Sequence, residues 1–208
     1  MKSKSIVAVI AFIAILTGLA VASVIRGTSP PLTLQSGSLL IPPRTMPNFA
    51  PMTAADGSAF TRGSLTGHWT LLYPGYSYCP DVCPTTLALL GALTKARAQA
   101  KTAVQVVFLS IDPARDTPRR LGDYVRAFNP HFIGITAQEP MLAEFTKIFG
   151  IAYSRVAGSD ASHYTMDHSS TLVLIDPKAR ISAYFTPPFS LQVLESDLHT
   201  ALSAGQTN

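Results

Sequence analysis

Cysteine is scarce in this chain: its 208 residues include only two, Cys79 and Cys83, in the short segment CPDVCP. All thiol chemistry of the chain is therefore confined to this segment. No cysteine lies directly after the apolar run near the N-terminus, which excludes a lipid-modified N-terminal cysteine.

Charge is scarce too, because charged residues make up only 13% of the chain. Of the 16 basic residues, Lys2, Lys4 and Arg26 flank the N-terminal apolar run, leaving 13 against 12 acidic residues. The remainder is nearly neutral, and it shows no basic stripe interleaved with aromatic residues. We therefore exclude nucleic acid as a partner.

Residues 5–25 (SIVAVIAFIAILTGLAVASVI) form an uncharged, largely apolar run. About twenty such residues in a helix span the roughly 30 Å core of a bilayer. The basic residues before it favour a cytoplasmic N-terminus. We predict that residues 1–26 are an N-terminal membrane anchor, a single transmembrane helix in the inner (cytoplasmic) membrane. The alternative is a cleaved signal peptide, because residues 20–22 (AVA) resemble a cleavage site.

Either interpretation places the rest of the chain in the periplasm, where thiols can oxidise. Residues 27–47 (GTSPPLTLQSGSLLIPPRTMP) are rich in Pro, Ser and Gly and lack helical periodicity. We predict that they form a semi-extended tether. The remaining residues, 48–208, are sufficient for one ordinary domain.

Segments typical of strands and helices alternate through this domain. Residues 104–111 (VQVVFLSI), for example, are almost all apolar and rich in β-branched side chains, as in a strand buried on both faces. The patterns predict strands at 70–73, 104–111, 132–136, 171–175 and 181–185, and helices at about 84–100, 118–128, 142–149 and 191–202.

This alternation, ending in a hairpin and a helix, predicts an α/β fold: a three-layer sandwich around a central mixed sheet. The cysteine pair lies at the first strand-to-helix junction, which is the thioredoxin arrangement. We therefore predict a thioredoxin-like fold preceded by the single N-terminal transmembrane helix.

The position of the cysteines predicts reactive sulfurs. Pro84 suits the first turn of a helix, so Cys83 lies at the helix start and Cys79 in the loop before it. Unpaired backbone N–H groups and the positive end of the helix dipole favour the thiolate, which lowers the thiol pKa. The carboxylate of Asp81 opposes this effect.

Three residues separate Cys79 from Cys83, whereas thioredoxin-type oxidoreductases have two. This longer loop can still close a redox-active disulfide, but it also allows both sulfurs to point at one soft metal ion. A structural disulfide, or two small buried hydrophobic side chains, remains a third interpretation.

A metal site needs a further ligand, and the chain has five histidines. His168 directly precedes a predicted strand whose entry loop, in a thioredoxin-like sheet, lies beside the start of the first helix. We predict that His168 reaches a metal ion held by Cys79 and Cys83. His163 is the second candidate, and Met166, a possible soft ligand, is better explained by core packing. The others are interpreted as structural or solvated side chains: His68, His131 and His199.

Two thiolates and one imidazole make a soft set of few ligands. Cu(I) accepts three such ligands, whereas Cu(II) would need a weak fourth group such as water. Zinc would take the same three and a fourth, so selection against zinc would depend on geometry and supply. The ligand set therefore suits a copper ion, Cu(I) or Cu(II), and leaves zinc open.

Three segments together resemble the signatures of the Sco/SenC family, whose members assist the assembly of cytochrome c oxidase. They are residues 75–86 (GYSYCPDVCPTT), 110–118 (SIDPARDTP) and 167–169 (DHS), and they occur in the family's order and spacing. The similarity extends from about residue 47 to about residue 202, and a membrane anchor is typical of the family.

The resemblance implies a thioredoxin-like, membrane-anchored copper chaperone with Cys79, Cys83 and His168 as copper ligands. Its partner would be the copper-receiving subunit of cytochrome c oxidase, whose dinuclear copper centre it helps to assemble. The alternative is a thiol-disulfide oxidoreductase that reduces the cysteines of that centre with its redox-active pair, Cys79 and Cys83. Either role requires a thiol reductant in the same compartment.

The second segment contributes three charged residues, Asp112, Arg115 and Asp116. They either order the site or dock a partner, or they form a salt-bridged surface loop. The chain also departs from the family pattern: Pro74 replaces an aromatic residue, and Ser77 and Tyr78 replace a common Thr-His pair. None of these departures removes a predicted ligand.

Overall fold

The computed structural model describes residues 10–18, 33–100, 102–158 and 163–206. The chain divides into two compact units, Met1–Leu32 and Thr33–Asn208. In the first unit, residues 10–18 are helical. No helix within the described ranges is long and apolar enough to cross a membrane. The rest of the predicted anchor lies outside the described residues.

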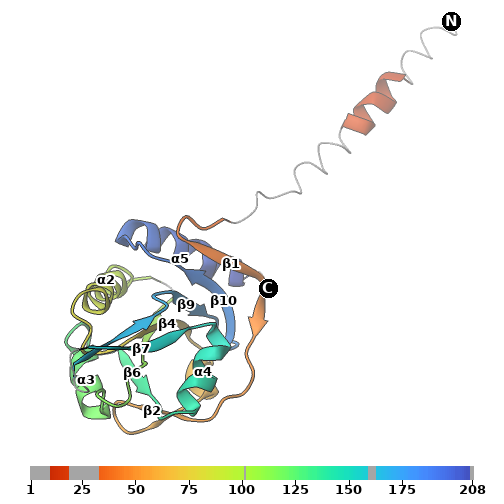
Figure 1. Ribbon diagram of the computed structural model, residues 1–208. Coiled ribbons are helices and arrows are strands. Elements are labelled where there is room, and N and C mark those ends of the chain that lie inside the picture. Colours follow the sequence, from red (N-terminus) through yellow and green to blue (C-terminus); the bar gives the residue numbers. More distant parts are fainter. Residues whose placement is uncertain (1–9, 19–32, 101, 159–162, 207–208) are drawn as a thin grey trace, which may run out of the picture. The chain divides into compact units, whose positions relative to one another are not determined.

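The second unit is built on an eight-stranded sheet with the strand order β1-β10-β9-β4-β5-β6-β2-β3 (Figure 1). Strands β4, β5 and β6 pair in parallel and all other pairs are antiparallel, so the sheet is mixed as predicted. The strands of this sheet are β1 (Gly37–Thr45), β2 (Met52–Ala54), β3 (Ala59–Phe60), β4 (Trp69–Gly75), β5 (Val104–Ser110), β6 (Ile133–Thr136), β9 (Leu172–Ile175) and β10 (Arg180–Phe185).

Helices cover both faces of this sheet and complete three layers (Figure 1). Alternate residues of a strand point to opposite faces, so Leu71 and Tyr73 join one hydrophobic cluster and Leu72 joins the other. Helices α2 (Val82–Ala96), α3 (Pro118–Arg126) and α5 (Leu191–Gln206) pack on the first cluster, and α4 (Met141–Phe149) packs on the second. The predicted α/β sandwich is confirmed.

A separate two-stranded sheet, β7 (Tyr153–Ala157) and β8 (Tyr164–His168), was missed by the sequence prediction. His168, predicted to lie in a loop, is the last residue of β8 and pairs with Tyr153. No residue of either strand is fully buried, so the two strands lack the apolar pattern that identifies a buried strand. The sequence prediction also missed three short elements at the start of the unit, because they are too short to show a hydrophobic periodicity. They are β2, β3 and the 3-10 helix η1 (Arg62–Leu65).

The predicted tether is wrong for residues 37–45, because they form β1 and pair with β10 at the edge of the sheet. Prolines suggested a loop, but an edge strand tolerates proline where pairing is interrupted. The register of β1 shifts between Leu39 and Arg44, and Pro42 and Pro43 lie in this interruption. The compact unit therefore begins near Thr33 and not at residue 48.

A buried carboxylate attaches the start of this edge strand to α5. Asp197 accepts hydrogen bonds from the Gln35 amide (2.7 Å), the Ser36 amide (2.8 Å) and the Ser36 hydroxyl (2.8 Å). The Asp197 side chain is almost fully buried, so the three donors replace the water that the carboxylate lost on folding.

We predict that Asp197→Ala lowers the free energy of unfolding by about 3 kcal/mol, because hydrogen bonds to a buried charge are lost and their donors stay desolvated. Urea denaturation of the full chain measures the change. Glu195→Ala, two residues away on the same helix, is the control and should change stability by less than about 0.5 kcal/mol. Equal effects of the two variants would show that Asp197 does not hold the edge strand.

Candidate metal and thiol site

The two cysteines occupy the connection between β4 and α2, as predicted. Cys79 lies in the loop and is half-buried, whereas Cys83 lies in the first turn of α2 and is 0% exposed. Both are free thiols, and the Cys83 amide donates to Cys79 Sγ at 3.3 Å. Only glycine fits at position 75, where a Cβ would stand 2.9 Å from Cys83 Sγ. The β4 backbone therefore closes one side of the site.

His168 reaches the cysteines from β8, with its Nε2 3.7 Å from Cys83 Sγ. Its Nδ1 lies 3.0 Å from the Ser169 carbonyl oxygen. A carbonyl can only accept, so Nδ1 carries the proton and the Nε2 lone pair faces the sulfur. The Tyr76 ring meets the imidazole edge to face at 6.1 Å. As predicted, His168 lies next to the cysteine segment.

The 3.7 Å distance between His168 Nε2 and Cys83 Sγ suits coordination of one ion by both atoms. Sulfur at roughly 2.3 Å and nitrogen at roughly 2.0 Å from one ion, about 120° apart, lie about 3.7 Å from each other. However, no three His, Cys, Asp or Glu side chains in the described ranges are close enough together to hold a metal ion as they stand. The three predicted ligands must therefore shift relative to one another if all three are to bind one ion.

The remaining histidines lie at the surface. His163, the second candidate, is exposed just before β8. Met166 packs partly buried against the hydrophobic core, as predicted. His68, His131 and His199 are exposed.

The predicted lowering of the pKa is wrong for Cys83. Burial raises its pKa from the ordinary value of 9.0 to about 12, and a hydrogen bond with Cys79 adds to this shift. The free energy lost when a thiolate is removed from water exceeds the stabilisation that the start of the helix provides, because Cys83 lies wholly inside the protein. Cys83 is therefore a neutral thiol at pH 7 until a ligand replaces its proton.

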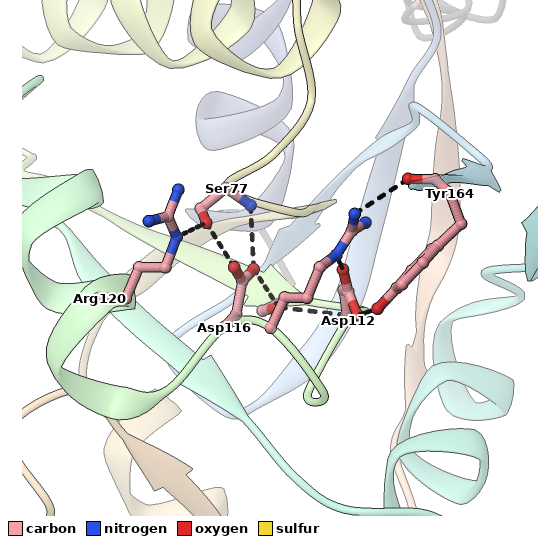
Figure 2. Close-up of polar contacts among 7 residues, drawn as sticks. Ser77, Asp112, Asp116, Arg120 and Tyr164 are labelled. Atoms are coloured by element: carbon pink, nitrogen blue, oxygen red, sulfur yellow. Dashed lines mark hydrogen bonds and ion pairs between the residues drawn. The ribbon is translucent and has the colours of Figure 1, made fainter. Parts of the chain in front are cut away.

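A buried carboxylate holds the cysteine loop in place (Figure 2). Asp116, which follows β5, accepts from the Ser77 amide at 2.9 Å and from the Ser77 hydroxyl at 2.5 Å. It also accepts from the Ser110 hydroxyl at 2.6 Å, and Arg120 Nε donates to Ser77 Oγ at 2.7 Å. The loop that carries Cys79 is thus tied to the end of β5.

A second buried carboxylate ties the same segment to the strand of His168 (Figure 2). Asp112 binds Arg115 Nε at 2.5 Å and accepts from the Tyr164 hydroxyl at 2.7 Å. Arg115 Nη1 donates to the Tyr164 carbonyl at 2.9 Å. Asp112 and Asp116 are at most 2% exposed, which excludes the salt-bridged surface loop. They order the site.

Sequence reasoning missed Ser77, Ser110 and Tyr164 as partners of these carboxylates. Small hydroxyl residues and a tyrosine carry no distinctive spacing, so nothing in the sequence assigned them this role. The available signal was their proximity to the motifs, since Ser77 lies two residues before Cys79 and Tyr164 four residues before His168.

Comparison with known proteins decides the family. The SCO1/SenC family model matches residues 42–203, which include the cysteine pair, both carboxylates and His168. The chain belongs to the SCO1/SenC family. A curated relative is the SCO2-like protein of Rickettsia prowazekii, 37% identical over 131 residues, which are 62% of this chain and 64% of the relative. The chain thus matches just under two thirds of the length of that SCO2-like protein.

Solved SCO1/SenC structures share the fold. The copper-bound structure of Arabidopsis thaliana ScoI aligns with a TM-score of 0.72 and 28% identity, covering 76% of this chain and 98% of that one. The copper-bound structure of Bradyrhizobium japonicum ScoI aligns with a TM-score of 0.66 and 32% identity, covering 74% and 97%. The predicted thioredoxin-like fold and family are both confirmed.

The raised pKa of Cys83 predicts a loss of stability in alkaline solution. Above about pH 9 the unfolded chain releases the thiol proton while the folded protein retains it, so unfolding becomes more favourable as pH rises toward 12. The metal-free protein should lose up to about 1.4 kcal/mol per pH unit in this range relative to Cys83→Ser. Urea denaturation at about pH 8, 9 and 10 measures the difference, and parallel curves for both proteins would contradict the assignment.

Proposed function

We propose that this SCO1/SenC protein is a membrane-anchored copper chaperone. Cys79, Cys83 and His168 bind the copper ion as cargo, and the chain transfers it to the copper-receiving subunit of cytochrome c oxidase during assembly of the dinuclear copper centre. The anchor is the apolar run of residues 5–25, and the folded unit lies in the periplasm.

One observation carries this proposal: the His168 Nε2 lone pair faces Cys83 Sγ at 3.7 Å, although the two residues lie 85 positions apart. Sulfur and imidazole ligands without a carboxylate suit Cu(I) better than Mg²⁺ or Ca²⁺. The copper-bound ScoI structures of Arabidopsis thaliana and Bradyrhizobium japonicum support the same cargo.

The protonated Cys83 gives the site a simple chemistry. A soft cation displaces the proton from the thiol, and the sulfur then binds as thiolate, so loading releases protons to solvent. Nδ1 keeps its proton and donates it in a hydrogen bond to the Ser169 carbonyl, which leaves Nε2 as the ligand atom. Because Cys79 is partly exposed, an incoming sulfur ligand of the recipient protein can reach the ion from its side.

We predict that His168→Ala weakens Cu(I) affinity of the full chain by more than about 100-fold, because the nitrogen ligand is lost. Competition with a chromogenic Cu(I) chelator measures the affinity, and copper-edge X-ray absorption counts the nitrogen neighbours. His163→Ala, in the same region of the chain, is the control and should bind as the wild type does. If only His163→Ala weakens binding, the ligand assignment is wrong.

The different exposure of the two thiols also suits a second function, thiol-disulfide exchange. The half-buried Cys79 can attack a disulfide of a partner, and the buried Cys83 can then attack the mixed disulfide. These two steps leave the partner with two thiols and convert Cys79 and Cys83 to a disulfide. A thiol reductant must then restore the pair.

The two functions differ in their need for His168. For an oxidoreductase, we predict that His168→Ala retains most of the reduction of a partner disulfide, because exchange uses only sulfur. Cys83→Ser should stop at the mixed disulfide, which is visible on a non-reducing gel. If reduction depends on His168 as strongly as copper binding does, exchange by the cysteines alone is excluded.

A further inference from the structure

Beside the thiol site, arginine and tyrosine side chains stack in one alternating row. Arg120 lies over the Tyr78 ring at 3.9 Å, and Arg115 lies over the same ring at 4.8 Å. Arg115 also stacks on Tyr164 at 3.5 Å, and Arg155 lies over Tyr164 at 3.7 Å. The row thus joins α3, the cysteine loop, β8 and β7.

The Arg120–Tyr78 end of this row is open to solvent. Tyr78 is 48% exposed although it directly precedes Cys79, and Arg120 is exposed on α3. Val82, adjacent to Cys83, is 49% exposed. Large exposed hydrophobic side chains are few in residues 33–206 that the structure describes, and each of these two is next to a cysteine in sequence. Exposed apolar side chains beside a functional site are typical of an interaction surface.

The charge of this surface depends chiefly on Arg120. Arg115 is compensated by Asp112 at 2.5 Å, whereas none of the ion pairs in the described part of the chain includes Arg120. Arg120 Nε donates a hydrogen bond to the Ser77 hydroxyl (Figure 2). This bond helps to hold the guanidinium over the Tyr78 ring. Asp81 and Asp167, which are close in sequence to the predicted metal ligands, are exposed and negatively charged. The positive charge is therefore confined to the row of arginine and tyrosine side chains.

We propose that Arg120, Tyr78 and Val82 form the docking surface for an acidic, partly apolar face of the protein that receives the copper. This inference rests on the proposed function. Tyrosine and arginine dominate binding energy at protein interfaces, and stacking orders both side chains before the partner arrives. A carboxylate of the partner on Arg120 would place its metal site beside Cys79.

The test measures binding of the full chain, kept in detergent, to the separately expressed copper-receiving domain of a cytochrome c oxidase. Arg120→Glu and Tyr78→Ala should each weaken binding at least about tenfold, while Tyr78→Phe, which keeps the ring, should bind as the wild type does. Arg126→Glu is the matched control: it lies on the same helix, makes the same change in net charge and should have little effect. Added salt should weaken wild-type binding more than binding by Arg120→Glu.

Copper affinity of each variant separates this inference from the proposed function. Unchanged Cu(I) affinity together with slower bimolecular transfer in Tyr78→Ala, whose side chain is outside the network that holds the cysteine loop, supports the docking surface. Equal transfer and binding by Arg120→Glu, Tyr78→Ala and wild type overturns it and leaves the chaperone function intact. A change in self-association with no change in recipient binding also overturns it, because the occupant is then a second copy. Failure of the wild type to load or transfer copper rejects the proposed function instead.

Discussion

The buried carboxylate of Asp116 is the interaction on which the site depends. It gathers the Ser77 amide, the Ser77 hydroxyl and the Ser110 hydroxyl at one point, where water is excluded. Such a charge is tolerated only when its hydrogen bonds are complete, so the surrounding segments have little freedom to move. Asp112 does the same between Arg115 and Tyr164. The connection after β5 thereby positions both the cysteine loop and the strand of His168.

This rigidity explains the different environments of the two thiols. The fixed β4 backbone at Gly75 and the first turn of α2 enclose Cys83, whereas Cys79 stays in a half-open loop. Full burial favours the neutral thiol, so Cys83 is held as a weak nucleophile beside an imidazole lone pair. Under the proposed function, Cys83 exchanges this proton for the copper ion on loading. A carrier and a reductant would both benefit from this asymmetry.

The sequence predicted the α/β sandwich, the cysteine junction and the position of His168 beside the cysteines, because periodic apolar segments and the family motifs leave clear patterns. It did not predict β1, since prolines mask an edge strand whose stability comes from β10 and Asp197. It did not predict the β7–β8 hairpin, because neither strand contains a fully buried residue. It also predicted the wrong direction for the Cys83 pKa, because the helix dipole is visible in a sequence and the depth of burial is not.

By itself, the sequence determined which chemistry is available: two sulfurs at the start of a helix, one imidazole far along the chain, and three motifs that identify the family. These depend on residue type and order, which any reader of the chain can see. Only the tertiary structure decided that the imidazole presents its lone pair to Cys83 at 3.7 Å, that Cys83 keeps its proton, and that Asp112 and Asp116 face inward. Distance and desolvation arise from contacts between residues remote in sequence, and no local pattern encodes them.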